Sequence, residues 1–224
     1  MTRAAHVEPG GAPFVEQLSD TVTLTKFSVG PMDNNAYLLA WSQGGEVSRL
    51  LIDAADEPDR IATLVGTPVP LTVVTTHRHG DHWQALPDLA AAWTPELVAG
   101  RPDVDAIATG AWLEDIEGVW DGDAIALGPE TLRVIGLVGH TPGSIALAYE
   151  APDGVSHLFT GDSLFPGGPG KTGSPEDFAS LLADLQTKVF ASFDDVTRVH
   201  PGHGDSTTIG AERPHLDEWR ARGW

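Results

Sequence analysis

Short apolar runs recur along the chain, separated by segments rich in glycine, proline and charged residues. Short runs that are bounded by turn residues are typical of β-strands. The pattern predicts strands at residues 22–29, 36–41, 47–52, 71–75, 96–99, 131–138, 145–149, 157–160 and 196–199. Because helical segments are predicted between many of these strands, the pattern indicates an α/β fold.

The clearest predicted helix begins after Ser174. Serine is a suitable N-cap, Pro175 suits the first helical position, and the acidic residues that follow complement the helix dipole. Apolar residues then recur at helical spacing, at Phe178, Leu181, Leu182, Leu185 and Val189. Further helices are predicted at residues 58–64, 82–92 and 211–222.

The chain of 224 residues is long enough for one sizeable domain, and its interior contains no linker-like segment. Residues 1–19, which include Pro9-Gly10-Gly11, are predicted to form an N-terminal extension, and residues 20–224 a single domain. The extension lacks the apolar stretch of a signal peptide, and no apolar run is long enough to span a membrane. We therefore expect a cytoplasmic protein without a membrane partner.

Charge and composition narrow the classes of function. A formal net charge of −19 argues against binding to nucleic acid, because Lys and Arg contacts to phosphates supply most of the non-specific affinity. The absence of cysteine excludes disulfides, a cysteine nucleophile and thiolate ligands. Any metal ligands must therefore be nitrogen or oxygen atoms.

Three histidines lie close together in residues 77–82, HRHGDH, just after the apolar segment 71–75. In an extended chain His77 and His79 point to the same side, while the glycine permits a turn that directs Asp81 and His82 elsewhere. Neutral imidazole and carboxylate are ligands of Zn²⁺ and similar divalent ions. The sequence therefore predicts one loop that serves two metal ions.

Three later loops each contain one more candidate ligand behind a strand-like segment. These are His140 in the sequence GHTPG, Asp162 in GDS and His203 in PGHG. With these motifs the chain resembles the metallo-β-lactamase superfamily, whose HxHxDH motif, followed in order by His, Asp and His, is matched at every position. The resemblance implies a four-layer αββα sandwich.

The same resemblance implies a dinuclear metal centre. Its expected metals are two divalent ions, Zn²⁺ first, with iron or manganese as alternatives. It implies that Asp162 bridges the two ions and that Asp81 also orients a hydroxide held between them. The implied ligands are His77, His79 and His140 at the first position, and Asp81, His82 and His203 at the second.

The segments GDSLF (161–165) and PGHG (201–204) are most similar to the short glyoxalase II-type thioesterases. That similarity implies a hydrolase in which the bridging hydroxide attacks the carbonyl of a small thioester, as in hydroxyacylglutathione hydrolases. Hydrolysis of a lactone or another ester remains an alternative, as does an iron-dependent persulfide dioxygenase with one metal. A complete set of seven ligands favours the dinuclear hydrolase over the dioxygenase and over a non-catalytic binding module, and the charge disfavours a nuclease.

Candidate substrate contacts lie beside these motifs. The similarity to glyoxalase II-like enzymes implies that Lys171, in the loop after Asp162, meets an anionic substrate group. Phe165 and Trp83 are predicted to line the pocket. Asp53 ends a predicted strand and is expected to orient a metal ligand without binding metal itself. The oligomeric state and the natural thiol carrier stay open.

One further histidine and two asparagines are predicted to have structural roles. His200 lies three residues before His203, but His203 is the preferred ligand because it lies inside the PGHG element. Asn34 and Asn35 are expected to form a turn, since asparagine tolerates tight backbone geometry.

Overall fold

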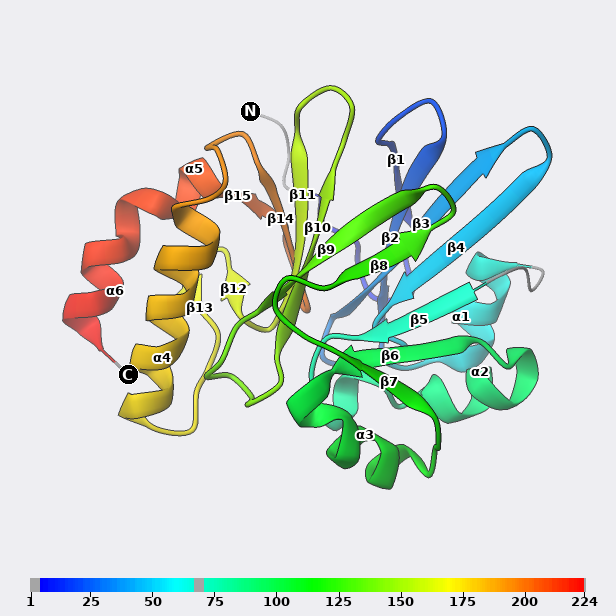
Figure 1. Ribbon diagram of the computed structural model, residues 1–224, viewed down its shortest axis with the longest axis horizontal. Coiled ribbons are helices and arrows are strands. Elements are labelled where there is room, and N and C mark those ends of the chain that lie inside the picture. The colour runs from blue at the N-terminus through cyan, green and yellow to red at the C-terminus, as the bar shows by residue number, and fades with distance from the viewer. Residues whose placement is uncertain (1–4, 67–70, 224) are drawn as a thin grey trace.

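Two β-sheets pack face to face between two groups of helices (Figure 1). This computed structural model describes residues 5–66 and 71–223. Residues 1–4 of the predicted N-terminal extension therefore lie outside the described residues.

The first sheet has seven strands, which lie in chain order. They are β1 (Phe14–Gln17), β2 (Val22–Val29), β3 (Asn34–Gln43), β4 (Glu46–Ile52), β5 (Leu71–Thr75), β6 (Glu96–Gly100) and β7 (Ile116–Val119). Strands β1 to β4 pair antiparallel, whereas β4 to β7 pair parallel. The parallel strands are joined by the crossover helices α1 (Pro58–Val65), α2 (Leu86–Trp93) and α3 (Val104–Ala111). Consequently the carboxyl ends of β4, β5 and β6 meet at one edge of the sheet.

The second sheet has six strands in the order β15-β14-β11-β10-β9-β8. They are β8 (Ala124–Leu127), β9 (Glu130–Gly136), β10 (Ile145–Glu150), β11 (Ser156–Gly161), β14 (Arg198–Pro201) and β15 (Thr207–Thr208). Strands β11 and β14 are parallel. Their connection contains the small hairpin β12 (Leu164–Phe165) and β13 (Gly168–Pro169), helix α4 (Pro175–Asp184) and a π-helical turn, Leu185–Phe190. Helices α5 (Ile209–Glu212) and α6 (Leu216–Arg222) complete the outer layer.

Three apolar clusters separate the four layers. One lies between the sheets and joins Leu50 of β4 to Leu147 of β10. A second packs Ile61 of α1 and Ile107 of α3 against the outer face of the first sheet. The third packs Leu181 of α4 against the outer face of the second sheet. This arrangement confirms the predicted αββα sandwich.

All nine predicted strands are present, with ends that differ by at most a few residues. Ser174 caps α4, because its hydroxyl accepts a hydrogen bond from the Asp177 amide. The pattern missed β1, β7, β8, β12, β13, β15 and α3. Most of these are very short or exposed on one face, and α3 contains Gly110 and Thr109, which weaken helical propensity.

Two expectations need correction. Asn34 and Asn35 do not form a turn: both are buried in β3, where their side chains make long-range hydrogen bonds. The helix predicted at 82–92 begins only at Leu86, because a 3₁₀ turn, Gly80–His82, first directs the ligand side chains inward. Within residues 5–66 and 71–223, no helix is long and apolar enough to cross a bilayer.

Candidate metal centre

The predicted ligands gather where parallel strands end. The HRHGDH loop follows β5, the loop with Asp162 follows β11, and the loop with His203 follows β14. Groups that follow the carboxyl ends of parallel strands share one edge of a sheet, which is where such folds place their binding sites. The two sheets therefore present these loops to each other.

His77, His79 and His140, here called the first trio, meet through their ring nitrogens. His140 Nε2 lies 3.2 Å from His77 Nε2 and 2.9 Å from His79 Nδ1. His77 is fully buried, while His79 borders solvent.

The second trio comprises Asp81, His82 and His203. His82 Nε2 lies 3.2 Å from His203 Nε2, and Asp81 Oδ2 lies 3.4 Å from His203 Nε2 and 3.5 Å from His82 Nε2. His82 is fully buried and the other two side chains are partly exposed.

Asp162 lies between the two trios. Its Oδ2 is 3.6 Å from His140 Nε2 and 3.4 Å from His203 Nε2, and its Oδ1 is 3.5 Å from His82 Nε2. Oδ1 is buried and has no hydrogen-bond partner within the described residues. The structure thus brings all seven predicted ligands together in overlapping groups whose candidate atoms lie within 4.8 Å of one another.

Hydrogen bonds on the far side of the rings orient three of the histidines. His140 Nδ1 donates to the Lys171 carbonyl (2.6 Å), His203 Nδ1 donates to the Met32 carbonyl (2.9 Å) and His82 Nδ1 donates to Asp53 Oδ2 (2.8 Å). With the hydrogen on Nδ1, the neutral form of each ring directs its Nε2 lone pair toward the centre. These converging lone pairs and the unpartnered carboxylate oxygen of Asp162 fit divalent metal ions.

Asp53 also fixes the start of the loop. Its carboxylate accepts hydrogen bonds from the Thr76 amide (2.8 Å) and hydroxyl (2.9 Å). Its own φ is 60°, a left-handed value that is uncommon outside glycine and is retained where the surroundings enforce it. Asp53 therefore connects the end of β4 to the HRHGDH loop and to His82.

The electrostatics of the two trios differ. Burial lowers the pKa of His77 well below its ordinary value and also lowers the pKa of His140. Burial opposes protonation of His82 as well, but Asp53 and Asp162 outweigh it and raise the pKa of His82 to about 10. For Asp162, burial disfavours the charged form, yet His203 and His82 hold its pKa far below the usual range.

The sequence profile of the metallo-β-lactamase superfamily matches residues 29–203, a span that contains all seven candidate ligands. The chain belongs to this superfamily.

Among its relatives, an uncharacterized protein of Mycobacterium leprae is 33% identical to this chain, over 85% of this chain and 95% of its own length. The hydroxyacylglutathione hydrolase GloC of Haemophilus influenzae is 33% identical over 58% of this chain, and the match spans only 55% of that enzyme. The crystal structure of TTHA1623 in a di-iron-bound form superposes with a TM-score of 0.65 and 31% identity, covering 84% of this chain and 96% of that one.

A pocket of about 450 Å³ opens beside the first trio of this superfamily member. His79 and His140 line it, together with Arg78 and the predicted substrate contact Lys171. The Lys171 carbonyl also accepts the hydrogen bond from His140, so this loop both borders the pocket and orients a candidate ligand.

The two aromatic candidates lie differently. Phe165 lies beside the second trio, with its ring centroid 6.4 Å from that of His203. The Trp83 indole N–H donates to the Arg78 carbonyl, and its ring packs so closely on α3 that a Cβ added at Gly110 would lie 2.6 Å from it. These contacts are those of a side chain that anchors the loop to the helical layer.

Asn34 was not predicted to take part in the site. Its side-chain amide donates to Asp81 Oδ2 (2.9 Å) and to the Asp81 carbonyl (3.0 Å), and its backbone bridges to His203. It therefore holds two members of the second trio from β3. The sequence signal was present as a pair of asparagines at the start of a strong strand, where a turn-forming role could not be distinguished from this one.

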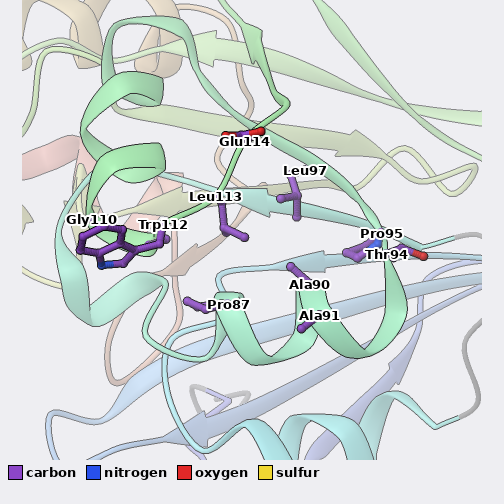
Figure 2. Close-up of a pocket in the computed structure, with 11 residues that line it drawn as sticks. Pro87, Ala90, Ala91, Thr94, Pro95, Leu97, Gly110, Trp112, Leu113 and Glu114 are labelled. Atoms are coloured by element: carbon purple, nitrogen blue, oxygen red, sulfur yellow. The ribbon is translucent and has the colours of Figure 1, made fainter.

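A second pocket lies away from the metal centre, between α2 and α3 (Figure 2). Its volume is about 550 Å³, and its walls are mainly alanine, proline and leucine side chains. Among the residues that the structure describes, Glu114 is the one titratable group that lines it. Trp112 at its rim is 91% exposed. Because its lining, in the part of the chain that the structure describes, includes no group of metal-binding side chains, this pocket is not the candidate active site.

Proposed function

We propose that this protein is a dinuclear metal-dependent hydrolase. The observation that carries the proposal is the convergence of seven imidazole and carboxylate side chains on one point between the two sheets. His77, His79 and His140 would hold one ion, and Asp81, His82 and His203 the other, with Asp162 between them. When bound, two such ions supply a water nucleophile at neutral pH and polarise a substrate carbonyl.

The protein's own residues would keep this centre in order. Asn34 holds the Asp81 carboxylate, so that Asp81 can accept a hydrogen bond from the attacking water and orient it. Hydrogen bonds from His140 and His203 to backbone carbonyls restrict the rotation of both rings. Such preorganisation lowers the barrier because the ligands do not rearrange during the reaction.

We further propose a small thioester as substrate. The supports are similarity to two hydroxyacylglutathione hydrolases, from H. influenzae and Fuscovulum blasticum, and a pocket lined by two cationic residues, Arg78 and Lys171. In a protein of net charge −19, cations at the mouth of the site favour an anionic substrate. The chain spans only 55% and 57% of the length of those two enzymes. The proposal therefore covers thioester hydrolysis and does not extend to their specificity for glutathione.

Metal analysis of the purified protein and a panel of thioesters, lactones and phosphodiesters test the proposal. We expect two equivalents of divalent metal and chelator-sensitive thioester hydrolysis. His79→Ala should lose metal and activity, whereas His215→Ala, a histidine on the surface that pairs with Glu218, should lose neither. A single equivalent of iron with oxygen uptake on a persulfide would overturn the hydrolase assignment in favour of the dioxygenase.

A further inference from the structure

Asp103 is a buried carboxylate that the metal centre does not itself use. It ends the 3₁₀ turn Arg101–Asp103, which follows β6, and its side chain is fully buried. It stands at the N-cap position of α3, but its side chain makes no capping hydrogen bond to that helix. Because burial of a carboxylate is costly without compensation, the partners of Asp103 indicate what it does.

Those partners lie beside the members of the first trio. Asp103 Oδ2 accepts a hydrogen bond from the amide of Arg78 (3.0 Å), the residue between His77 and His79. The same oxygen accepts a hydrogen bond from the Thr141 hydroxyl (2.5 Å), and Oδ1 accepts one from the Gly143 amide (2.9 Å). Thr141 directly follows His140.

These contacts connect the two halves of the sandwich. Arg78 belongs to the loop after β5 of the first sheet, whereas Thr141 and Gly143 belong to the loop between β9 and β10 of the second. The backbones approach so closely here that a Cβ on Gly143 would lie 2.4 Å from the Asp103 nitrogen, and one on Gly100 1.9 Å from the Gly143 carbonyl oxygen. Neither glycine can carry a side chain without separating the loops.

We propose that Asp103 is a positioning residue that sets the spacing of the first trio across the two halves and so controls metal affinity at the first position only. This inference rests on the proposed dinuclear centre. Within the described residues no hydrogen bond joins Asp103 to a candidate ligand ring; it acts through the neighbours of those rings, by way of the Arg78 and Gly143 amides and the Thr141 hydroxyl, and the Arg78 Nε lies 4.0 Å from its Oδ1. Members of the second trio are held by direct side-chain contacts instead, His82 by Asp53 and Asp81 by Asn34.

The test uses variants in which one metal position at a time remains. In a His203→Ala background, the remaining metal equivalent reports the first trio, and in a His140→Ala background it reports the second. Addition of Asp103→Asn should weaken Zn²⁺ binding about 10- to 100-fold in the first background and leave it unchanged in the second. Competition with a chromogenic chelator measures both affinities without recourse to catalysis.

Two further variants separate geometry from charge and from general destabilisation. Thr141→Val keeps the carboxylate but removes one of its hydrogen bonds, so it should weaken the first position in the same direction by a smaller factor. Asp121→Asn removes another carboxylate that accepts a backbone hydrogen bond, from Gly136, and should change neither position.

The inference would be overturned if Asp103→Asn left the Zn²⁺ affinity unchanged in both backgrounds. An equal loss at both positions, or an unchanged first position in Thr141→Val, would overturn it too. These results differ from failure of the proposed function, in which the unmodified protein itself would bind no divalent metal or only one equivalent.

Discussion

The two trios occupy one centre but are built differently. The first consists of three imidazoles, and burial lowers the pKa values of two of them, His77 and His140. Asp103 links their loops by accepting hydrogen bonds from the Arg78 amide, the Thr141 hydroxyl and the Gly143 amide. The second contains a carboxylate of its own, and Asp53 contacts one of its rings directly and helps to raise the pKa of His82. A chain can thus support neighbouring metal positions by fixing backbone spacing at one and by holding side chains at the other.

The largest effect should come from removal of one ligand from each trio. His140→Ala and His203→Ala should each cost one metal equivalent and lower the proposed thioesterase activity roughly 10³-fold, since loss of one ion removes several kcal/mol of transition-state stabilisation. Elemental analysis and initial rates on the same preparations measure both quantities. Two retained equivalents in either variant would show that the trios are not separate positions.

Acid should destabilise the metal-free protein through two buried histidines of the second sheet. Behind the His203 loop, His157 of β11 and His200 of β14 are buried in contact, with Nδ1 of one 3.1 Å from Nε2 of the other. Burial and the nearby Arg198 lower the pKa of His157 to about 4, and burial, His157 and Lys26 lower the pKa of His200, while Asp153 opposes the shift at His157.

The sign follows from proton linkage. Between pH 6.5 and about pH 4 the unfolded chain binds a proton at His157 and the folded protein does not. The free energy of unfolding therefore decreases as the pH is lowered through this range. The expected loss from His157 alone is about 3 kcal/mol at the acid end. Urea unfolding of metal-free protein at pH 7.5, 5.5 and 4.5 measures it. An equally steep decline in His157→Gln would contradict the assignment.

A smaller effect is expected when a side chain is added at Gly202, next to Asp162 and His82. A Cβ on Gly202 would lie 2.2 Å from Asp162 Oδ1 and 2.7 Å from the His82 ring, so Gly202→Ala should cost about 1–3 kcal/mol of stability and reduce metal binding at the second position. Gly80→Ala is the matched control, because its Cβ would meet only Trp83, at 3.8 Å. Similar thermal midpoints for the two variants would refute the steric argument.

The smallest expected change comes from Asp53→Asn. The amide keeps the size of the side chain but loses the charge that holds His82. The Zn²⁺ affinity of the second position should therefore fall about 10-fold, the lower end of the roughly 10- to 100-fold range typical of residues that orient ligands. Zinc titration in the His140→Ala background measures this affinity directly. An unchanged value would mean that Thr76 alone orients the loop.

The residues that gather at the candidate centre could be predicted because each lies in a short local motif. Residues 77–82 carry four of the candidate ligands in one loop, and each remaining ligand lies in a short loop behind a strongly apolar strand. Strand β5 was located correctly for the same reason, since all but one of its residues are buried.

Asp103 and Asn34 could not be found in the same way. Their roles depend on contacts with Thr141 and Asp81, which lie 38 and 47 residues away in the chain and meet them only once strands pair and the sheets pack. One signal was nevertheless available for Asp103: it follows the end of β6 much as Asp53 follows the end of β4. Neighbouring parallel strands bring both to one edge.

The order of the ligands along the chain has a consequence for synthesis. His82 and His203 meet in the second trio, although 121 residues separate them. At a typical rate of about 5–20 residues per second, the ribosome adds His203 roughly ten seconds after His82. During that interval the nascent chain displays an incomplete set of donors, so the second trio cannot assemble until β14 and the loop after it have been synthesised.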